Sequence, residues 1–456
     1  MTSSGDSIKP NPFDEDVRSN LPDSESFVRQ QVKTIGTMYA AYATSMILRM
    51  IPTVAGTSII NDEALGIDLD QWGKVLSAGT CGALSGKFIC GWAADRFGGR
   101  RTFAIALFIA SVFVGLFAMS STLLLFQATF FVTLMAQAAG WPSMTRVILN
   151  WVPPRQYGRV WGILSTSSRV GTLTATFVLG STLTFLSWRQ MLWIASGIGL
   201  LTACFYAFAM KDKPTTPLPT DDEDSKSGEE NPRNANHPFD GLTLLQALPR
   251  FAGSLRFWLI CGSLMGLTIL WDFLLVVPVY MQDTLGLNEA SASRAASAFP
   301  FGSLISVLIG GFVFDKLDRT SMAWVMAGLL VTATGCLLAF TWLPQLGLSG
   351  SAATLTVLVL LFMFGLCVSP CYYIPCSVFS IDFGGPHSGF LVAILDAVGF
   401  AATAVFYYFG GGIAQRLGWN AFLFVLVGVC VWSLMTTFFF MRREARAKKS
   451  GAVSRC

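Results

Sequence analysis

The sequence is built from a long series of apolar segments separated by short polar stretches. A helix needs about 20 predominantly apolar residues to cross the hydrocarbon core of a bilayer, and these segments have that length. Transmembrane strands would be about 10 residues long and would alternate apolar with polar residues, which these segments do not. The pattern therefore predicts an all-α membrane protein that crosses the bilayer many times.

The composition agrees with a chain that lipid, rather than water, surrounds. Hydrophobic residues make up 53% of the 456 residues and charged residues only 13%, whereas a soluble domain carries about 25% charged residues. The net charge of +4 needs no nucleic acid to explain it, because the basic residues stand at the ends of the apolar segments. A soluble globular protein and a nucleic-acid-binding protein are both excluded.

We expect twelve membrane helices in two sets of six. The first set is predicted at 34–57, 71–93, 102–120, 122–147, 159–186 and 189–210. The second set is predicted at 257–281, 292–314, 321–343, 352–378, 388–412 and 419–441. Among the prolines of these segments, Pro142, Pro278 and Pro300 are expected to bend their helices, which membrane proteins tolerate.

Polar segments divide the chain into five expected parts. Residues 211–254 are rich in proline and charge, as in KDKPTTPLPTDDEDSKSGEENPRNANHPFDG, and predict a flexible linker. The expected parts are a disordered tail at 1–33, a six-helix bundle at 34–210, the linker at 211–254, a second bundle at 255–441 and a basic tail at 442–456. Six helices on each side of a linker are typical of transporter folds built from two related halves.

The basic residues predict the orientation in the membrane. Arg96, Arg155, Lys211 and Lys316 all lie in alternate loops, while the opposite loops carry acids such as those of Asp62–Glu63. The positive-inside rule then places both termini and the linker in the cytosol. The acidic start of the chain resembles neither a secretory signal nor a transit peptide. We expect the plasma membrane, with an organelle membrane as the alternative.

A short motif appears twice, at equivalent places in the two halves. The first copy runs from Gly91 to Arg101 (GWAADRFGGRR), and the second runs from Gly311 to Arg319 (GFVFDKLDR). Both copies resemble the signature loop of the major facilitator superfamily, with Gly99 as an apparent insertion. The resemblance implies a gating role for the residues Gly91, Asp95, Arg96, Arg100, Arg101, Asp315 and Lys316.

Five ionisable residues are expected at membrane depth. A charge is costly there, so each of these residues is a candidate for a functional role. Arg49, Lys87 and Arg169 lie in the first half, where Asp95 is the only acidic residue between Asp70 and Asp212. A bound anion, or a carboxylate from the second half, would neutralise these bases.

The second half contributes Asp272 and Asp396 to this set. They are expected either to pair with the bases across a cavity, or to carry a coupling proton. Arg169 is a candidate both for anion binding and for contact between the halves.

Several segments resemble the organophosphate:phosphate antiporters, which exchange glycerol 3-phosphate and hexose phosphates. Tyr42 precedes Arg49 by seven residues, Lys87 stands in SGKFICG, and Gly140-Trp-Pro is followed by Arg146, as in that family. The resemblance implies a rocker-switch exchanger in which Tyr42, Arg49 and Lys87 bind substrate.

Two positions depart from the pattern of that family. Leu270 occupies the place of a second substrate arginine, and Ser168, beside Arg169, the place of a histidine. Anion selectivity is therefore expected to be retained, while transporters of carboxylates, such as the anion:cation symporters, stay open as relatives.

Three functional hypotheses follow. The first is a secondary transporter of a small organic anion, phosphorylated or carboxylated, with phosphate or protons as coupling ion. The second is a proton-coupled transporter of a carboxylate or a neutral solute, led by Asp272 and Asp396, and the third is a non-transporting membrane sensor. No enzyme, cofactor or metal site is expected, because the ten cysteines are scattered and His237 and His387 stand in linker and loop. A monomer is expected, because one chain of this kind encloses a complete pathway.

Overall fold

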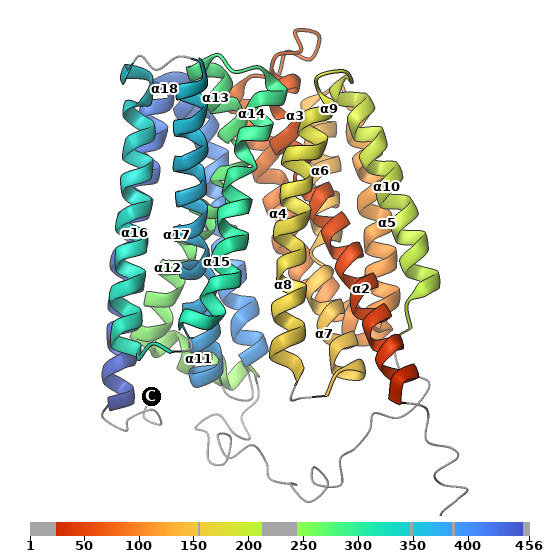
Figure 1. Cartoon of the computed structure of the whole chain (residues 1–456), viewed down its shortest axis with the longest axis vertical. Helices are drawn as coiled ribbons and strands as arrows, with labels where there is room; N and C mark the ends of the chain where they lie inside the picture. Colours follow the sequence, from red (N-terminus) through yellow and green to blue (C-terminus); the bar gives the residue numbers. More distant parts are fainter. Residues whose placement is uncertain are drawn as a thin grey trace, which may run out of the picture.

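The computed structural model describes residues 24–153, 156–211, 244–314, 316–346, 350–384 and 388–449. Every regular element in these ranges is helical. Figure 1 shows the helices before the linker and those after it as two upright bundles that lie side by side. The predicted all-α architecture is confirmed. We call the end of the molecule at which α10 stops and α11 begins the linker side, and the opposite end the far side.

The first bundle contains the elements that precede the linker. They are α2 (Ser24–Arg49), α3 (Ile51–Ile60), α4 (Leu69–Phe97), α5 (Gly99–Ala118), α6 (Leu123–Gln137), α7 (Gly140–Trp151), α8 (Tyr157–Thr174), the π-helical turn η2 (Ala175–Leu179), α9 (Gly180–Thr182) and α10 (Trp188–Ala209).

The second bundle contains the elements that follow the linker. They are α11 (Leu244–Gly253), α12 (Leu255–Asp272), the 3-10 turn η3 (Phe273–Leu275), α13 (Val277–Leu285), α14 (Glu289–Ala296), α15 (Ala298–Phe314), α16 (Arg319–Trp342), η4 (Leu343–Leu346), α17 (Gly350–Gly384) and α18 (Ser388–Lys449).

Nine helical segments of the described chain are long and apolar enough to cross a membrane. One of them, Leu391–Arg446, covers two passages, because the backbone bends at Gly418, where φ is 84°. The more polar helices α4 and α8 are not among the nine, and they carry Lys87 and Arg169. With these two and the division at Gly418, the helices fit the twelve expected passages.

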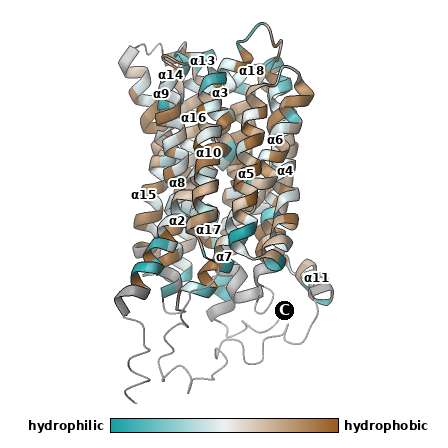
Figure 2. Cartoon of the chain, turned by 90° about the vertical axis from the view of Figure 1, so that its right-hand side faces the viewer, coloured by the Kyte–Doolittle hydropathy of each residue, from teal (hydrophilic) through white to brown (hydrophobic). Residues whose placement is uncertain are grey.

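Apolar side chains face outward along the height of the bundles. Figure 2 shows hydrophobic residues along the helices and hydrophilic residues gathered toward the two ends. Large apolar side chains are strongly exposed, among them Phe208 (88%), Leu124 (74%) and Leu201 (74%). A water-soluble surface would not carry so much exposed apolar area, so this surface faces lipid.

Three helices run into segments that were expected to be tail or linker. The expected tail at 1–33 contains the start of α2, whose Gln31 side chain donates a hydrogen bond to the Trp151 carbonyl at 2.9 Å. The expected linker contains helix α11 at its end. The expected basic tail continues α18 as far as Lys449, because Glu444 pairs with Arg256 at 3.2 Å. For α2 and α18, a hydrogen bond or ion pair to a distant helix accompanies the extension.

The first membrane helix of each bundle is broken near its middle. α2 ends at Arg49 and α3 begins at Ile51, with Pro52 in its first turn. α12 ends at Asp272, η3 follows, and α13 carries Pro278 in its first turn. Proline has no N–H to continue the ladder of hydrogen bonds, so both helices stop at a charged residue. The predicted bend at Pro278 is confirmed.

Hydrogen bonds join the two bundles on the far side. Ser58 of α3 donates to Glu289 of α14 at 2.5 Å, and Ser293 donates to the Thr176 carbonyl at 3.0 Å. α4 and α18 also approach closely there: a Cβ on Gly73 would stand 2.6 Å from the Tyr407 carbonyl oxygen. These contacts hold the bundles together at the far side.

Candidate functional site

The five ionisable residues expected at membrane depth meet between the two bundles. The Arg49 guanidinium lies 3.7 Å from the Asp272 carboxylate, and the Lys87 ammonium lies 2.5 Å from that of Asp396. Each base comes from the first half of the chain and each acid from the second. The structure thus places both carboxylates beside bases of the opposite half, as one of the two alternatives for these residues expects.

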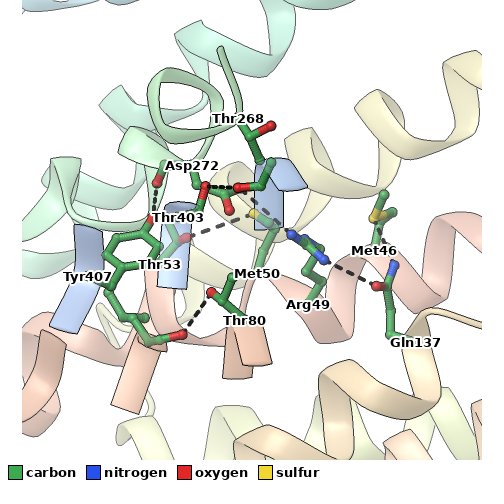
Figure 3. A network of polar contacts seen from close by, with 12 residues as sticks. Met46, Arg49, Met50, Thr53, Thr80, Gln137, Thr268, Asp272, Thr403 and Tyr407 are labelled. Atoms are coloured by element: carbon green, nitrogen blue, oxygen red, sulfur yellow. Dashed lines mark hydrogen bonds and ion pairs between the residues drawn. The ribbon is translucent and has the colours of Figure 1, made fainter. Parts of the chain in front are cut away.

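The Arg49–Asp272 pair is deeply buried and loosely made. The side chains are 12% and 4% exposed, and Oδ2 of Asp272 has no hydrogen-bond partner. Figure 3 shows Gln137 beside Arg49, where its Oε1 accepts a hydrogen bond from Nη1 at 3.3 Å. Tyr407 donates to the backbone carbonyl of Asp272, which lies where α12 stops (Figure 3). The neighbours therefore hold the backbone of Asp272 and the guanidinium of Arg49, and leave one carboxylate oxygen without a partner.

The Lys87–Asp396 pair is tighter and less buried. Its side chains are 19% and 25% exposed. The ring of Phe400 links the two pairs, because Lys87 lies 5.1 Å and Arg49 lies 5.6 Å from its centroid. Cations at this distance are attracted to the face of an aromatic ring, so Phe400 stabilises both positive charges.

Arg169 makes its polar contacts with neutral groups. Its Nη1 donates to the Ser165 carbonyl and to the Ser168 hydroxyl, both at 2.9 Å, while Nε has no partner. Its guanidinium lies 5.4 Å from the ring centroid of Trp271, which belongs to the second half. Arg169 thus contacts the opposite bundle through an aromatic ring, and no carboxylate of the described chain pairs with it.

The charged positions are related by the internal repeat. Asp272 follows Arg49 by 223 residues (272 minus 49), and each stands at the break in the first membrane helix of its half. Asp396 follows Arg169 by 227 residues (396 minus 169), close to the 220 residues (315 minus 95) between the signature aspartates. Equivalent positions therefore carry a base in the first half and an acid in the second.

A small cavity of about 40 Å³ lies beside the Arg49–Asp272 ion pair. Its lining comes from both bundles: Met46, Arg49, Met50, Ser168, Arg169, Thr172, Trp271, Asp272, Leu274, Leu275, Phe299 and Pro300. A volume of this size holds a few water molecules, whereas ligand pockets measure about 300–1,000 Å³. A substrate can enter only after the bundles move apart.

Tyr42 lies outside this lining. It is 2% exposed, its ring centroid is 5.7 Å from that of Trp141, and a Cβ on Gly140 would overlap its ring. The Gly140-Trp141 sequence therefore receives Tyr42 as a packing partner in this structure. Leu270 is also fully buried.

The first signature loop is held by ion pairs and backbone contacts. Asp95 pairs with Arg146 at 2.7 Å, and Arg100 donates to the Ala207 carbonyl. Gly98 has a φ of 86°, and a Cβ on Gly99 would collide with the backbone of Ser143. Both glycines are needed for α4 to turn into α5 against α7, which explains the apparent insertion.

The remaining signature residues lie at the surface or beyond the described residues. Arg96, Arg101 and Lys316 are exposed, and a Cβ on Gly91 would meet open space. Asp315 lies outside the described residues, as do His237 and His387. Asp318 begins α16 instead, and hydrogen bonds from Ser321 and Thr320 hold the pKa of its carboxyl below the ordinary value.

Sequence reasoning missed two residues of the site, Gln137 and Phe400. Gln137 is a buried amide within the apolar segment 122–147, and polar groups at membrane depth are rare enough to serve as a signal. Phe400 carried no signal, because it is one of 37 phenylalanines in an apolar chain.

Comparisons with known proteins identify a family and several relatives. The model of the Major Facilitator Superfamily matches residues 34–379 and 273–455. The chain is 22% identical to the glucose-6-phosphate exchanger SLC37A2 of Mus musculus, over 80% of this chain and 78% of that one. It is 24% identical to the hexuronate transporter of Bacillus subtilis, over 91% and 96%. It is also 24% identical to the membrane sensor protein UhpC of Escherichia coli, over 61% and 64%.

A solved structure shares the fold. A bacterial homologue of the human lysosomal transporter Spinster superposes with a TM-score of 0.70 at 15% identity, and the match covers 91% of this chain and 97% of that one. The paired bundles, the repeated signature loop and the family match over most of the chain lead to one conclusion: this integral, multi-pass membrane protein belongs to the major facilitator superfamily.

Proposed function

We propose that this chain is a secondary transporter that carries a small organic anion across the membrane by alternating access. The observation that carries the proposal is the charge balance between the bundles. Arg49, Lys87 and Arg169 bring three positive charges, while Asp272 and Asp396 bring two negative ones. An unbalanced buried charge is costly, so the site lacks one anion.

The geometry supports binding of that anion at Arg49 and Arg169. Both line the cavity, and their partners are replaceable: Asp272 is held at a long 3.7 Å, and Arg169 contacts neutral oxygens. Charge-assisted hydrogen bonds to an anion are stronger than these contacts. A bound anion would take the place of Asp272 beside Arg49 and so loosen the link between the bundles.

We infer that the bundles 34–210 and 255–441 rock about this site. The far-side contacts would open while the linker side closes, as in other transporters built from two halves. The hydrogen bond between Ser58 and Glu289 would then break, and Gly73 would move away from Tyr407. The signature residues Asp95, Arg96, Arg100, Arg101, Asp315 and Lys316 would control closure of the linker side.

The substrate proposed first carries a phosphate, in keeping with the exchanger among its relatives. A carboxylate is the second candidate, because the hexuronate transporter matches nearly the whole chain and a second substrate arginine is replaced by Leu270. Phosphate is bound best by two-pronged arginine contacts. Inorganic phosphate is proposed as the counter-ion in the first case and a proton in the second.

The proposed orientation follows the basic loops. The linker side, with Arg96, Lys211 and Lys316, is placed in the cytosol, together with both termini. The plasma membrane is proposed as the host membrane, and a monomer as the working unit.

The test is uptake of labelled phosphate into proteoliposomes that contain the full chain. Uptake that requires phosphate inside the vesicles would establish exchange. If phosphate is not taken up, glucuronate is tested with and without a proton gradient. A chain that moves neither anion, but binds one of them, would support the sensor hypothesis and contradict transport.

A further inference from the structure

Two unpartnered buried polar atoms belong to residues that line one cavity. Within the described ranges, Oδ2 of Asp272 and Nε of Arg169 are buried and make no hydrogen bond. Asp272 comes from α12 and Arg169 from α8, so the lining includes one residue with an unpartnered acceptor and one with an unpartnered donor. Because an unmade buried hydrogen bond costs free energy, this arrangement suits a ligand with one acceptor group and one donor group.

The other hydroxyl groups of the lining are already used. The Ser168 hydroxyl donates to the Ser165 carbonyl at 3.0 Å and accepts from Arg169. The Thr172 hydroxyl donates to the Ser168 carbonyl at 2.9 Å. The hydroxyl donors of the lining are therefore engaged, which leaves few donors for a ligand with many hydroxyl groups.

Apart from Asp272, the wall from the second half is apolar. It consists of Trp271, Leu274, Leu275, Phe299 and Pro300, which we call the apolar wall. The ring of Trp271 packs against Phe299 and stacks on Tyr372, with centroids 5.5 and 5.6 Å apart. Sugar hydroxyls against this wall would stay unpaired, whereas a hydrocarbon or aromatic body would gain from burial.

The charges of the lining set the charge of the ligand. Arg49 and Arg169 are positive and Asp272 is negative, so one negative charge makes the cluster neutral. Lys87 and Asp396 balance each other outside the lining. A dianion would leave an excess negative charge beside Asp272, which is 4% exposed.

Resting on the proposed anion transport, and choosing its second candidate, the carboxylate, over the phosphate, we propose that the substrate is a monoanionic hydroxy acid with an apolar or aromatic body. Its carboxylate binds Arg49 and Arg169. Its hydroxyl donates a hydrogen bond to Oδ2 of Asp272. Its body packs against the apolar wall, with Trp271 as the main contact.

The test compares two ligands that differ by one hydroxyl group. Isothermal titration calorimetry on the detergent-purified full chain measures binding of 3-phenyllactate, 3-phenylpropionate and glucose 6-phosphate. We expect 3-phenyllactate to bind about tenfold more tightly than 3-phenylpropionate, as a hydrogen bond to a buried charged group provides. Glucose 6-phosphate is expected to bind more weakly than either.

Two variants assign the effect to its residues. Asp272→Leu should bring the two phenyl ligands to equal affinity, because the acceptor is gone. Trp271→Leu should weaken both about tenfold and leave their ratio unchanged. Trp342→Leu is the matched control, since this tryptophan is 52% exposed and lies outside the lining. Size-exclusion chromatography checks that each variant is folded. If Asp272→Leu is not folded, the affinities of the two phenyl ligands for the unaltered chain test the role of Asp272.

The outcomes separate this inference from the proposed function. Glucose 6-phosphate that binds and is transported, with no competition from 3-phenyllactate, would overturn the inference and leave anion transport intact. Equal affinity of the two phenyl ligands for the unaltered chain would remove the role of Asp272. A chain that neither binds nor transports any of these anions, phosphate and glucuronate included, would overturn both proposals.

Discussion

The two ion pairs between the bundles differ in length and burial. The difference indicates that one pair takes part in binding and the other holds the bundles together. Arg49–Asp272 is the longer and more buried pair, lines the cavity and leaves a carboxylate oxygen free. Lys87–Asp396 is the shorter and more exposed pair, and neither residue lines the cavity. A short salt bridge satisfies its own partners, so the loose pair is the one that a substrate anion can replace.

Position along the helices supports the same distinction. Lys87 stands ten residues before the end of α4 (97 minus 87), and Asp396 eight residues after the start of α18 (396 minus 388), both toward the linker side. Arg49 and Asp272 instead occupy the helix breaks, and their side chains meet between the bundles. The anion-binding role expected for Lys87 therefore stays a prediction, and its pairing with Asp396 favours bracing.

The largest effect is expected from removing Arg49. Arg49→Ala leaves Asp272 buried without a counter-charge, which costs about 3–5 kcal/mol, and it removes the main anion ligand. Uptake into proteoliposomes should fall by at least about 100-fold. The control is Arg189→Ala, which breaks a more exposed pair with Asp62 at 3.2 Å and should change uptake little. Normal uptake by Arg49→Ala would contradict the proposed role of this arginine.

Exchanging the charges within each pair tests the comparison directly. Lys87→Asp combined with Asp396→Lys keeps a salt bridge between the bundles and should restore most of the uptake lost in Lys87→Ala. Arg49→Asp combined with Asp272→Arg should stay inactive, because it moves the anion ligand to the opposite wall. Initial uptake rates of the two exchanged pairs, of Lys87→Ala and of Arg49→Ala provide the comparison. Equal recovery by both exchanged pairs would show that the pairs do the same work.

A substitution between α4 and α18 tests whether transport needs the close far-side approach of these two helices. Gly73→Ala puts a methyl group 2.6 Å from the Tyr407 carbonyl oxygen and should push the helices apart, costing about 1–3 kcal/mol. Uptake should fall about tenfold, with a lower unfolding temperature. Gly197→Ala, where a Cβ meets nothing within 4 Å, is the control. Unchanged behaviour of Gly73→Ala would mean that the far-side contact is not closed during transport.

The smallest effect is expected at Gln137. Gln137→Leu removes the amide that accepts a hydrogen bond from Arg49 at 3.3 Å, while the ion pair with Asp272 stays. A net loss of about 1 kcal/mol corresponds to about a fivefold rise in KM, with kcat nearly unchanged. Uptake kinetics over a range of substrate concentrations separate the two parameters. Gln137→Glu should lower affinity further, because a carboxylate beside Arg49 would compete with the substrate anion.

The amino-acid sequence alone determined the membrane architecture and the sign of the charge at the site. Transfer to lipid depends on the apolar length of each segment, so the bundles could be predicted without knowing any contact. Asp95 as the one acid between Asp70 and Asp212 already indicated that Arg49, Lys87 and Arg169 need partners from elsewhere.

Tertiary structure decided how those charges are arranged. The rotation of each helix about its axis places Arg49 beside Asp272 and Gln137, brings Phe400 near two cations, and buries Tyr42 against Trp141. Contacts between distant segments also accompany the extension of α2 and α18 into polar stretches. Hydrophobic burial is nearly additive along the chain, but an ion pair depends on ångström-scale distances between residues hundreds of positions apart, which only helix packing decides.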